Sequence, residues 1–320
     1  MTGEGEVPFE HRPVMVAEVL RLLEPVPPGL VVDATVGGGG HAAAILGSRP
    51  DLRLLGIDRD PAAVAAAGAA LEPFGARGRI VRGGFEGVAD IVGPGHSGEG
   101  SEAIVGILFD LGVSSAQLDS RVRGFSYWAD EAPLDMRMDS AQTLTADTVV
   151  NDYSEADLAA LIARNGEERY ARRIAAQIVA ARPLHTTGDL VAAVKAGIPA
   201  AARRRGGHPA RRTFQAIRIE VNRELPNLAA GLDESVHLLA PEGRMLVLAY
   251  HSLEDRVVKE RFTDWARTEE AGFVPRELPR RKRDALVRLV TRRPLRPSAD
   301  ETAANPRAES ARLRAVERLG

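Results

Sequence analysis

The residues with the clearest potential for chemistry are four consecutive glycines, Gly37–Gly40, which are followed by His41. A largely apolar segment, 30–36, precedes them, and an alanine-rich segment with helical character follows. Glycine adopts positive φ in a tight turn, and the missing Cβ atoms let a ligand approach the backbone. The first N–H groups of a helix have no intrahelical partner and bind anionic groups. The pattern predicts a strand, a turn and a helix whose N-terminus faces a nucleotide-like ligand.

A carboxylate follows the glycines after about 20 residues, at Asp58, where the apolar segment 54–57 ends. An acidic side chain at this place accepts hydrogen bonds from both hydroxyls of a ribose. Together with the glycine-rich turn, it predicts an adenosine-containing cofactor. Two alternatives remain open. The turn also suits a flexible surface loop, and Gly37, Gly39 and Ala42 also satisfy the G-x-G-x-x-A pattern of NAD-type sites.

The elements that must position these residues follow an alternation of strands and helices. Strands are predicted over about 30–34, 53–58, 79–82 and 104–110, with a helix from about 41 and another over 62–71 that begins at Asp60-Pro61. This alternation predicts an α/β fold with a parallel sheet covered by helices on both faces. Ligands bind such sheets at the carboxyl ends of the strands, and Asp33, Asp58, Phe85 and Asp110 all lie at or just past such ends.

The alternation stops after the fourth strand. Between about 120 and 209 no strand pattern appears, and helices are predicted over 154–163, 167–181 and 190–196. A segment this long is not a loop, so we predict an inserted helical subdomain over 120–209, between α/β parts at 1–119 and 210–320. The later elements predicted are a helix from about 213, a helix ending near 239, a strand over 243–250, a helix over 253–267, and strands over 286–291 and 311–319.

Composition narrows the function. The chain has 320 residues, 42 basic and 44 acidic, and a net charge of −2, so any nucleic-acid binding depends on local patches. The absence of cysteine excludes disulfides, thiolate metal sites and a cysteine nucleophile. No apolar run reaches the roughly 18–20 residues of a membrane span, and the first six residues are polar and acidic. We therefore expect a cytoplasmic protein without a membrane partner, and we predict no metal site.

Three longer segments carry polar and charged residues in a fixed order. They are DLGVSSAQLD at 110–119 (followed by RGFS at 123–126 and PLDMRMD at 133–139), HPARRTFQAIR at 208–218 (followed by VN at 221–222), and HSLEDR at 251–256. With HRPV at 11–14 and the glycine-rich turn, these segments closely resemble the RsmH (MraW) family. Members of that family are S-adenosylmethionine-dependent methyltransferases that act on 16S ribosomal RNA. The resemblance runs from His11 to the end of the chain.

The resemblance implies a Rossmann-like class I methyltransferase domain interrupted by a helical substrate-binding domain. It implies N4-methylation of a cytidine at the P-site of the decoding centre, with 16S rRNA in the small ribosomal subunit as the partner. By motif position, the implied contacts to S-adenosylmethionine are Gly39, Gly40, His41, Asp58, Phe85, Asp110 and Gln117. The sequence departs from the family pattern at Ala42, where serine is common, and at Gly84, where asparagine is usual.

The residue types suit these roles. Backbone N–H groups at the helix start suit the cofactor's carboxylate, Asp58 suits the ribose and Phe85 offers an apolar face for adenine. Asp110 complements the cationic end of the ligand, and Gln117 can hydrogen-bond to it. Structural alternatives stay open: Asp58 as a helix cap, Phe85 as core, and Gln117 as a residue that ties down its own loop.

The missing cysteine also bears on the target atom. Cytosine C5 becomes nucleophilic only after a thiolate adds to C6, so the sequence favours an amine target. An attacking N4 amine needs an acceptor for its proton. Asp110 is a candidate, although it also suits an anchor for the cofactor's cationic end. His251 and Glu254, with Asp255, are further candidates after the fifth predicted strand, and His251 equally suits a cap of the next helix.

RNA binding is predicted for arginines that no acidic residue interrupts: Arg203, Arg204, Arg205, Arg211 and Arg212. The alternative is a solvated arginine loop. Phe125, Tyr127 and Trp128 suit stacking on a splayed base or the core of the subdomain. Two other functions remain open, an NAD(P)-dependent oxidoreductase and a non-catalytic ribosome-assembly factor. The sequence is also compatible with a homodimer.

Overall fold

The computed structural model describes residues 13–93, 102–112, 123–203, 207–268 and 284–320. The chain divides into two compact units, and each is described by itself. The first joins residues 1–112 to 228–320, and the second spans 113–227. The bounds 120–209 for the inserted subdomain stay a prediction.

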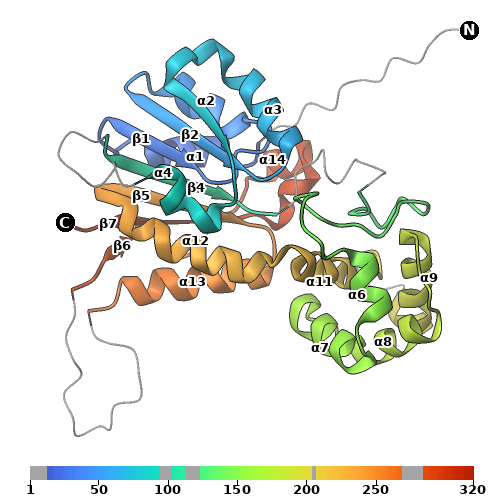
Figure 1. Ribbon diagram of the computed structural model, residues 1–320. Coiled ribbons are helices and arrows are strands. Elements are labelled where there is room, and N and C mark those ends of the chain that lie inside the picture. The colour runs from blue at the N-terminus through green and yellow to red at the C-terminus, as the bar shows by residue number, and fades with distance from the viewer. Residues whose placement is uncertain (1–12, 94–101, 113–122, 204–206, 269–283) are drawn as a thin grey trace, which may run out of the picture. The chain divides into compact units, whose positions relative to one another are not determined.

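A seven-stranded sheet forms the centre of the first unit (Figure 1). Its strands are β1 (Gly29–Asp33), β2 (Leu52–Asp58), β3 (Gly78–Arg82), β4 (Ile104–Asp110), β5 (Leu239–Ala249), β6 (Val287–Leu289) and β7 (Arg312–Arg318). The strand order is β3-β2-β1-β4-β5-β7-β6. β7 is antiparallel to both of its neighbours, whereas the pairs from β3 to β5 are parallel. All seven strands were predicted from the sequence, and β5 begins earlier than expected.

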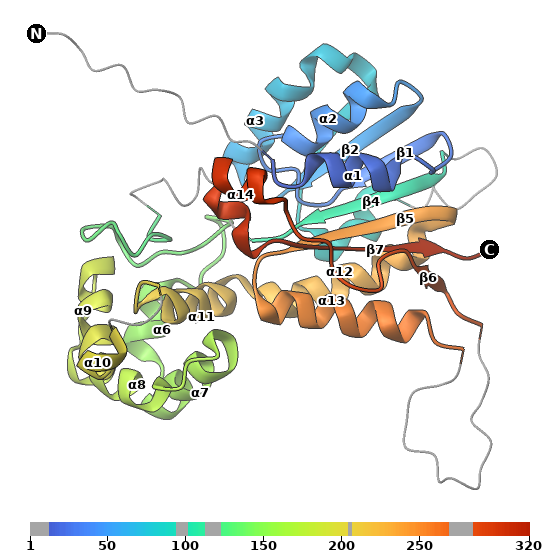
Figure 2. The same ribbon diagram turned by 180° about the vertical axis from the view of Figure 1, so that it is seen from behind.

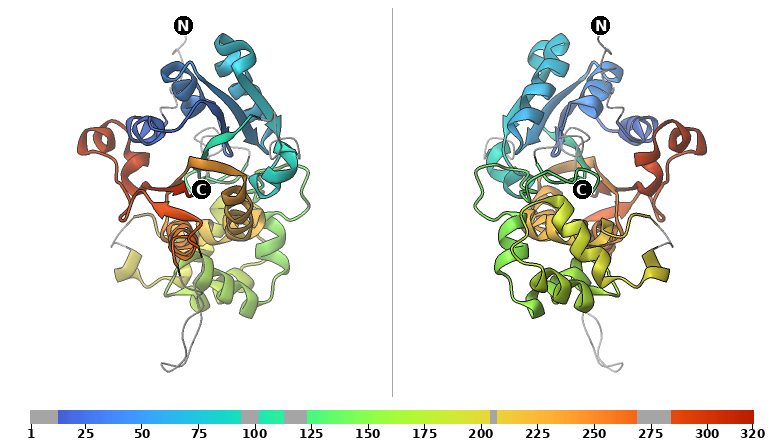
Figure 3. Two further views of the ribbon diagram at one scale, coloured as in Figure 1. Left: turned by 90° about the vertical axis from the view of Figure 1, so that its left-hand side faces the viewer. Right: turned by 90° about the vertical axis from the view of Figure 1, so that its right-hand side faces the viewer.

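Helices cover both faces of this sheet. They are α1 (Val16–Leu23), α2 (Gly40–Ser48), α3 (Pro61–Leu71), α4 (Val88–Val92), α12 (Glu224–Leu238), α13 (Ser252–Trp265) and α14 (Ala299–Ala304). One apolar core joins α1, α2 and α3 to the sheet, and α1 and α2 can be followed in Figure 2. A second core joins α4, α12 and α13 to the opposite face, where Figure 3 shows α12 and α13 together. The predicted arrangement of a sheet between two helical layers is confirmed.

Burial explains why the central strands read as continuous apolar runs. Every residue of β4 before Asp110 is buried, because helices cover both faces of the strand. The edge strand β3 is only partly buried. The helix that follows β2 begins as predicted. Asp60 caps α3 by accepting a hydrogen bond from the Ala62 N–H at 3.0 Å, and Pro61 takes the first helical position.

The second unit is helical. Its helices are α6 (Ala146–Asp152), α7 (Glu155–Gly166), α8 (Ala171–Ala180), α9 (Thr187–Gly197), α10 (Ala200–Arg203) and α11 (Arg211–Asn222). Ser154 and Thr186 cap α7 and α9, which fixes where these helices begin. Leu158, Ile174 and Phe214 belong to its single apolar core. The described part of this unit contains no strand, as the sequence predicted.

Gly39 provides a test of how tightly the first turn is constrained. It has a φ of +82°, and a Cβ atom there would lie 3.0 Å from Ala70 Cβ and 3.1 Å from Ala67 Cα. Gly39→Ala should lower the free energy of unfolding by about 1–3 kcal/mol, because of left-handed strain and crowding. Gly68→Ala, in α3 where a Cβ meets nothing within 4 Å, should raise it by about 0.5–1 kcal/mol. Urea denaturation compares the two, and equal effects would contradict this account.

Candidate cofactor site

The strand order reverses between β1 and β4, which is where open α/β sheets bind ligands. Asp58, at the end of β2, reaches across to the turn after β1. Its Oδ2 accepts the Gly37 N–H at 3.0 Å, and its Oδ1 accepts the Asp60 N–H at 2.9 Å. Burial raises the pKa of this carboxyl, although the two N–H donors oppose the shift. A carboxylate has about four acceptor sites, so Asp58 can hold the turn by hydrogen bonds and still accept hydrogen bonds from the two hydroxyls of a ribose.

The turn leads into α2 with its backbone close to neighbouring elements. The Gly39 N–H donates to the Val36 carbonyl at 2.8 Å, and Gly39 is the N-cap of α2. A Cβ at Gly38 would meet nothing within 4 Å, so this side of the turn is open to a ligand. Ala42 is fully buried in the core, so its methyl group has a packing role. The turn therefore fits an anionic or polar ligand group at the helix N-terminus.

Asp110 is held by side chains from other elements. Its Oδ1 accepts a hydrogen bond from the Tyr250 hydroxyl at 2.7 Å, and its Oδ2 lies 3.4 Å from His41 Nδ1. The Asp110 N–H donates to Thr35 Oγ1 at 2.6 Å. The side chain is 20% exposed, so it retains access to the site. Tyr250 was missed by the sequence analysis, although it directly follows the apolar β5 at the same sheet edge.

Both ring nitrogens of His41 face other protein atoms. Its Nε2 donates to the Val14 carbonyl at 2.8 Å, so Nε2 carries a proton and Nδ1 faces Asp110. Burial alone would lower the pKa of His41, but the carboxylates of Asp110 and Asp33 together with the Val14 carbonyl raise it. The imidazole is thereby favoured as a cation between two carboxyl groups. Its side chain thus positions Asp110, whereas its backbone belongs to the first turn of α2.

Asp33 completes this buried group. Its side chain is 1% exposed and accepts the Thr35 N–H at 3.2 Å. Burial raises the pKa of Asp33 to about 7, even though the charge of His41 acts in the opposite direction. Burial also raises the pKa of Tyr250 well above its ordinary value, and the neighbouring Asp110 adds to the shift. The site therefore contains a neutral phenol donor, a histidine and, in Asp33, a carboxyl group whose ionisation is opposed by burial.

Phe85 stands at the rim of the same sheet edge. It begins a short 3-10 turn, η2 (Phe85–Gly87), and is half-buried. Its ring packs edge-on against Phe109 with centroids 5.6 Å apart, and Arg59 Cζ lies 5.8 Å from its centroid. Arg59 pairs with Glu86 at 2.7 Å, and the Glu86 carboxylate fills the space that a Cβ at Gly84 would need. Phe85 thus packs on the core and keeps a partly exposed ring, and its contact with adenine stays a prediction.

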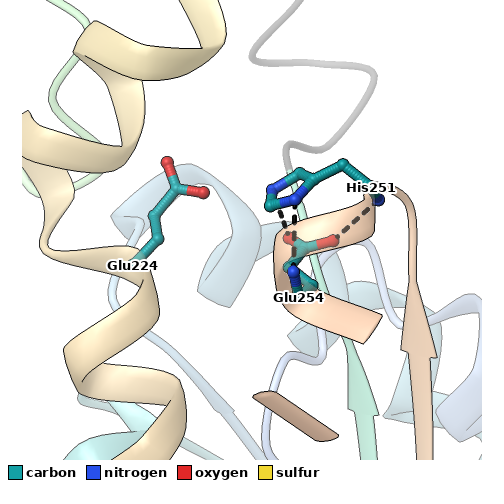
Figure 4. A group of neighbouring side chains, drawn as sticks. All are labelled: Glu224, His251 and Glu254. Carbon is teal, nitrogen blue, oxygen red and sulfur yellow. Dashed lines mark hydrogen bonds and ion pairs between the residues drawn. The ribbon is translucent and has the colours of Figure 1, made fainter. Parts of the chain in front are cut away.

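His251 and Glu254 form the start of α13 (Figure 4). His251 Nδ1 accepts the Glu254 N–H at 3.3 Å, and Glu254 Oε2 accepts the N–H groups of Tyr250 at 2.8 Å and His251 at 3.2 Å. This is a reciprocal capping box, so His251 caps α13, which is one of the two roles that the sequence suggested for it. Asp255 is occupied by Arg314 and Arg312, which lower the pKa of its carboxyl against the effect of burial. A catalytic role of His251 or Glu254 stays a prediction.

The remaining predicted residues belong to the helical unit or lie outside the described residues. Gln117, Arg204 and Arg205 are outside them. Arg203, Arg211 and Arg212 are exposed. Arg203 Nε donates to the Ile198 carbonyl at 2.8 Å, and an Arg212 guanidinium N–H donates to the Glu167 carbonyl at 3.1 Å. These contacts use one guanidinium N–H of each of the two arginines, and both residues remain exposed.

The three predicted aromatic residues of the helical unit have different environments. Phe125 is buried in the apolar core, and Tyr127 is partly buried against it. Trp128 is 74% exposed.

In the described part of the chain, no helix has both the length and the apolar character that a membrane span requires.

Fold and site together define a class of protein. The order β3-β2-β1-β4-β5, extended by an antiparallel pair, differs from the six-stranded parallel order of dinucleotide-binding domains. A glycine-rich turn follows the first strand, and Asp58 and Asp110 lie around the switch point. The first unit therefore has a Rossmann-like class I methyltransferase fold. The predicted fold class is confirmed.

Comparison with known proteins identifies the family. The sequence pattern of the MraW methylase family matches residues 8–319, so the chain belongs to this family. It is 51% identical over 317 residues to the "Ribosomal RNA small subunit methyltransferase H" of Symbiobacterium thermophilum, covering 97% of each chain. It is 49% identical over 322 residues to the protein of the same name from Kocuria rhizophila, covering 98% of this chain and 96% of that one. Membership excludes the oxidoreductase alternative, and the protein is a methyltransferase.

The buried Asp33 predicts a distinctive pH dependence. Because its folded-state pKa is about 7 against an ordinary value of 3.8, the folded protein retains a proton here that the unfolded chain has released. The contribution of Asp33 to the free energy of unfolding therefore falls as pH rises from about 4 to about 7. Asp33→Asn removes this loss and keeps an oxygen for the Thr35 N–H. As pH rises from about 4 to about 7, the free energy of unfolding of the variant should therefore increase relative to that of the parent, by on the order of a few kcal/mol.

Urea denaturation at several pH values measures this difference. Asp51→Asn is the matched control, because Asp51 is exposed and its partner Arg49 lowers the pKa of its carboxyl. Its contribution has the opposite sign, since a lowered pKa gives stability that is lost as pH falls. A parallel pH dependence in the two variants would show that burial of Asp33 does not carry the effect.

Proposed function

We propose that this protein transfers the methyl group of S-adenosylmethionine to N4 of a cytidine in the decoding centre of 16S rRNA, at the P-site. The relatives that match nearly the whole chain carry the name of a small-subunit ribosomal RNA methyltransferase, which supports ribosomal RNA as the substrate. S-adenosylmethionine is the methyl donor. The observation that carries the proposal is the convergence of Asp58, Asp110 and the start of α2 at the switch point of the sheet.

The cofactor residues fit an adenosine with a charged amino-acid tail. The N–H groups of Gly40 and His41 hold the carboxylate at the helix N-terminus, and Gly39, whose own N–H bonds to the Val36 carbonyl, lets the ligand approach the backbone. Asp58 accepts the ribose hydroxyls and Phe85 supports adenine, with Gln117 as a further contact. When bound, this cofactor supplies an electrophilic methyl group on a positively charged sulfur. The open space beside Gly38 and the spare acceptor sites of Asp58 support this assignment.

Asp110 is assigned to the cationic end of the cofactor. Tyr250 and His41 hold its carboxylate in one orientation, so its negative charge is fixed before any ligand binds. The residues at 111–113 lack the prolines and the aromatic residue that many amino-methyltransferases carry after this carboxylate, which favours anchoring over proton acceptance. Orientation of N4 against the methyl group then supplies much of the rate. His251 and Glu254 are retained as second candidates for contact with the amine.

The RNA partner is assigned to the arginines of the helical unit. Arg203, Arg211 and Arg212 are exposed cations, as phosphate binding requires, and Arg204 and Arg205 extend the same stretch of sequence. Small-ribosomal-subunit RNA is the partner in this proposal, and a cytoplasmic location follows from it. The homodimer left open by the sequence has no support from these observations.

The direct test of the function is nucleoside mass spectrometry of 16S rRNA from a strain that lacks the protein. We expect loss of an N4-methylated cytidine at one decoding-centre position, restored when the purified protein and S-adenosylmethionine are added to small subunits from that strain. Intact N4-methylation in the strain would contradict the proposal and would favour a non-catalytic assembly role. Loss of a different methylated nucleoside would contradict the assigned target atom.

Asp58→Ala tests the cofactor assignment. The variant loses two hydrogen bonds from ribose hydroxyls to a charged acceptor, so affinity for S-adenosylmethionine should fall roughly 10- to 1000-fold. Asp51→Ala is the matched control, because Asp51 is an exposed aspartate that precedes β2 and pairs with Arg49. Calorimetry measures both dissociation constants. An unchanged constant for Asp58→Ala would show that Asp58 serves only the turn.

A further inference from the structure

The helical unit exposes one large aromatic side chain, Trp128. Its indole is 74% exposed, while the other tryptophan of the chain, Trp265, is 6% exposed. Single exposed apolar residues are common on protein surfaces, so exposure alone carries no function. The surroundings of Trp128 are more informative, because it is the outermost of several rings in contact.

These rings contact one another in series and are called the aromatic stack here, although only Tyr127 and His208 are parallel and Trp128 is tilted against both. Trp128 lies against His208 with centroids 4.6 Å apart, and against Tyr127 at 5.5 Å. Tyr127 and His208 are stacked nearly parallel, 4.6 Å apart with 8° between their planes. Tyr127 then meets the buried Phe214 edge-on at 5.8 Å, which joins the stack to the apolar core. The exposed Trp128 therefore lies against rings that are joined to the apolar core.

His208 is set as a neutral ring. Its Nδ1 accepts the Ala210 N–H at 3.3 Å, so the proton of the neutral imidazole is on Nε2. Burial lowers the pKa of His208, and the charge of Lys195 lowers it further against the opposing effect of Asp130. A neutral imidazole can stack on a base and donate one hydrogen bond. The neighbouring cations are suited to bind phosphates.

Positively charged residues lie near this stack, with Asp130 as an acidic neighbour. Arg211 follows His208 by three residues, and its N–H donates to the His208 carbonyl at 3.0 Å. Its guanidinium lies 3.9 Å from the position of a Cβ at Gly207. Arg203 and Arg212 are exposed in the same unit. Aromatic rings beside exposed arginines are the combination that binds unpaired nucleic acid, because bases stack on the rings and cations hold the backbone.

We propose that Trp128, supported by His208 and Tyr127, is a stacking platform for an unpaired base of the RNA substrate. This rests on the proposed function for the choice of RNA, but it concerns binding and not methyl transfer. The aromatic stack supplies affinity that is independent of salt, and the arginines supply the part that depends on it. Charge complementarity favours RNA over an apolar protein partner as the occupant.

The chain permits a direct spectroscopic test, because only one of its two tryptophans is exposed. A single-stranded RNA 12-mer should quench the tryptophan fluorescence of the full-length protein. Trp265→Phe should keep this quenching and Trp128→Phe should abolish it. Quenching that survives in Trp128→Phe would contradict the stacking proposal.

Binding measurements separate stacking from charge. Trp128→Ala should weaken binding of the same RNA about 5- to 100-fold with an unchanged salt dependence, and Trp128→Phe should recover most of the loss. Leu289→Ala is the matched control, since Leu289 is the other large apolar residue exposed among the described residues, at 37%. The double variant Arg211→Ala/Arg212→Ala should instead make the salt dependence shallower, by nearly one unit of slope for each lost phosphate contact.

Two further outcomes would overturn the proposal. If Trp128→Ala binds the RNA as tightly as the parent, the platform does not bind bases. If its affinity falls only for assembled small subunits, the indole contacts a ribosomal protein. Failure of the proposed function has a different signature, because the parent protein would then bind RNA and quench normally but would not methylate cytidine.

Discussion

A small group of buried and partly buried polar side chains at the carboxyl end of the sheet constrains the rest of the site. Asp33, His41, Asp110 and Tyr250 come from β1, α2, β4 and the residue after β5. Buried charges persist only when they are paired and hydrogen-bonded, so these four elements must meet in one arrangement. The contacts from His41 and Tyr250 to the Asp110 carboxylate satisfy that requirement. The carboxyl edge of the sheet and its hydrogen-bonding group are therefore specified together.

The same constraint explains what is left for a ligand. Because both ring nitrogens of His41 face protein atoms, its side chain is turned into the protein and only its backbone is available at the start of α2. Asp58 similarly fixes the glycine-rich turn through the Gly37 N–H while keeping acceptor capacity. Groups held before the ligand arrives lose little freedom on binding and need no reorganisation during the reaction. Preorganisation of this kind is what a reaction that depends on alignment requires.

The sequence predicted the fold well because its signals are local. Apolar runs gave the strands, and Asp60-Pro61 gave the start of α3. The arrangement of the site was less accessible, since the partners of Asp110 lie 69 residues before it and 140 after it, and no pattern joins them. His251 could be seen to suit two roles, but only the structure showed the hydrogen bonds of the cap. The different burial of Phe125 and Trp128 also depends on tertiary packing, which their positions in the sequence do not reveal.

We propose that the held carboxylate of Asp110 anchors the cationic end of the cofactor, and one substitution can test this proposal. Asp110→Asn tests it most directly, because the change preserves size and removes the charge. The measurements are the dissociation constant of S-adenosylmethionine and the single-turnover rate of methyl transfer at saturating cofactor. We predict a larger dissociation constant, which means weaker cofactor binding, and a methyl-transfer rate that largely persists. An unchanged dissociation constant with a large fall in rate would contradict it, because the charge would then act mainly in the transition state.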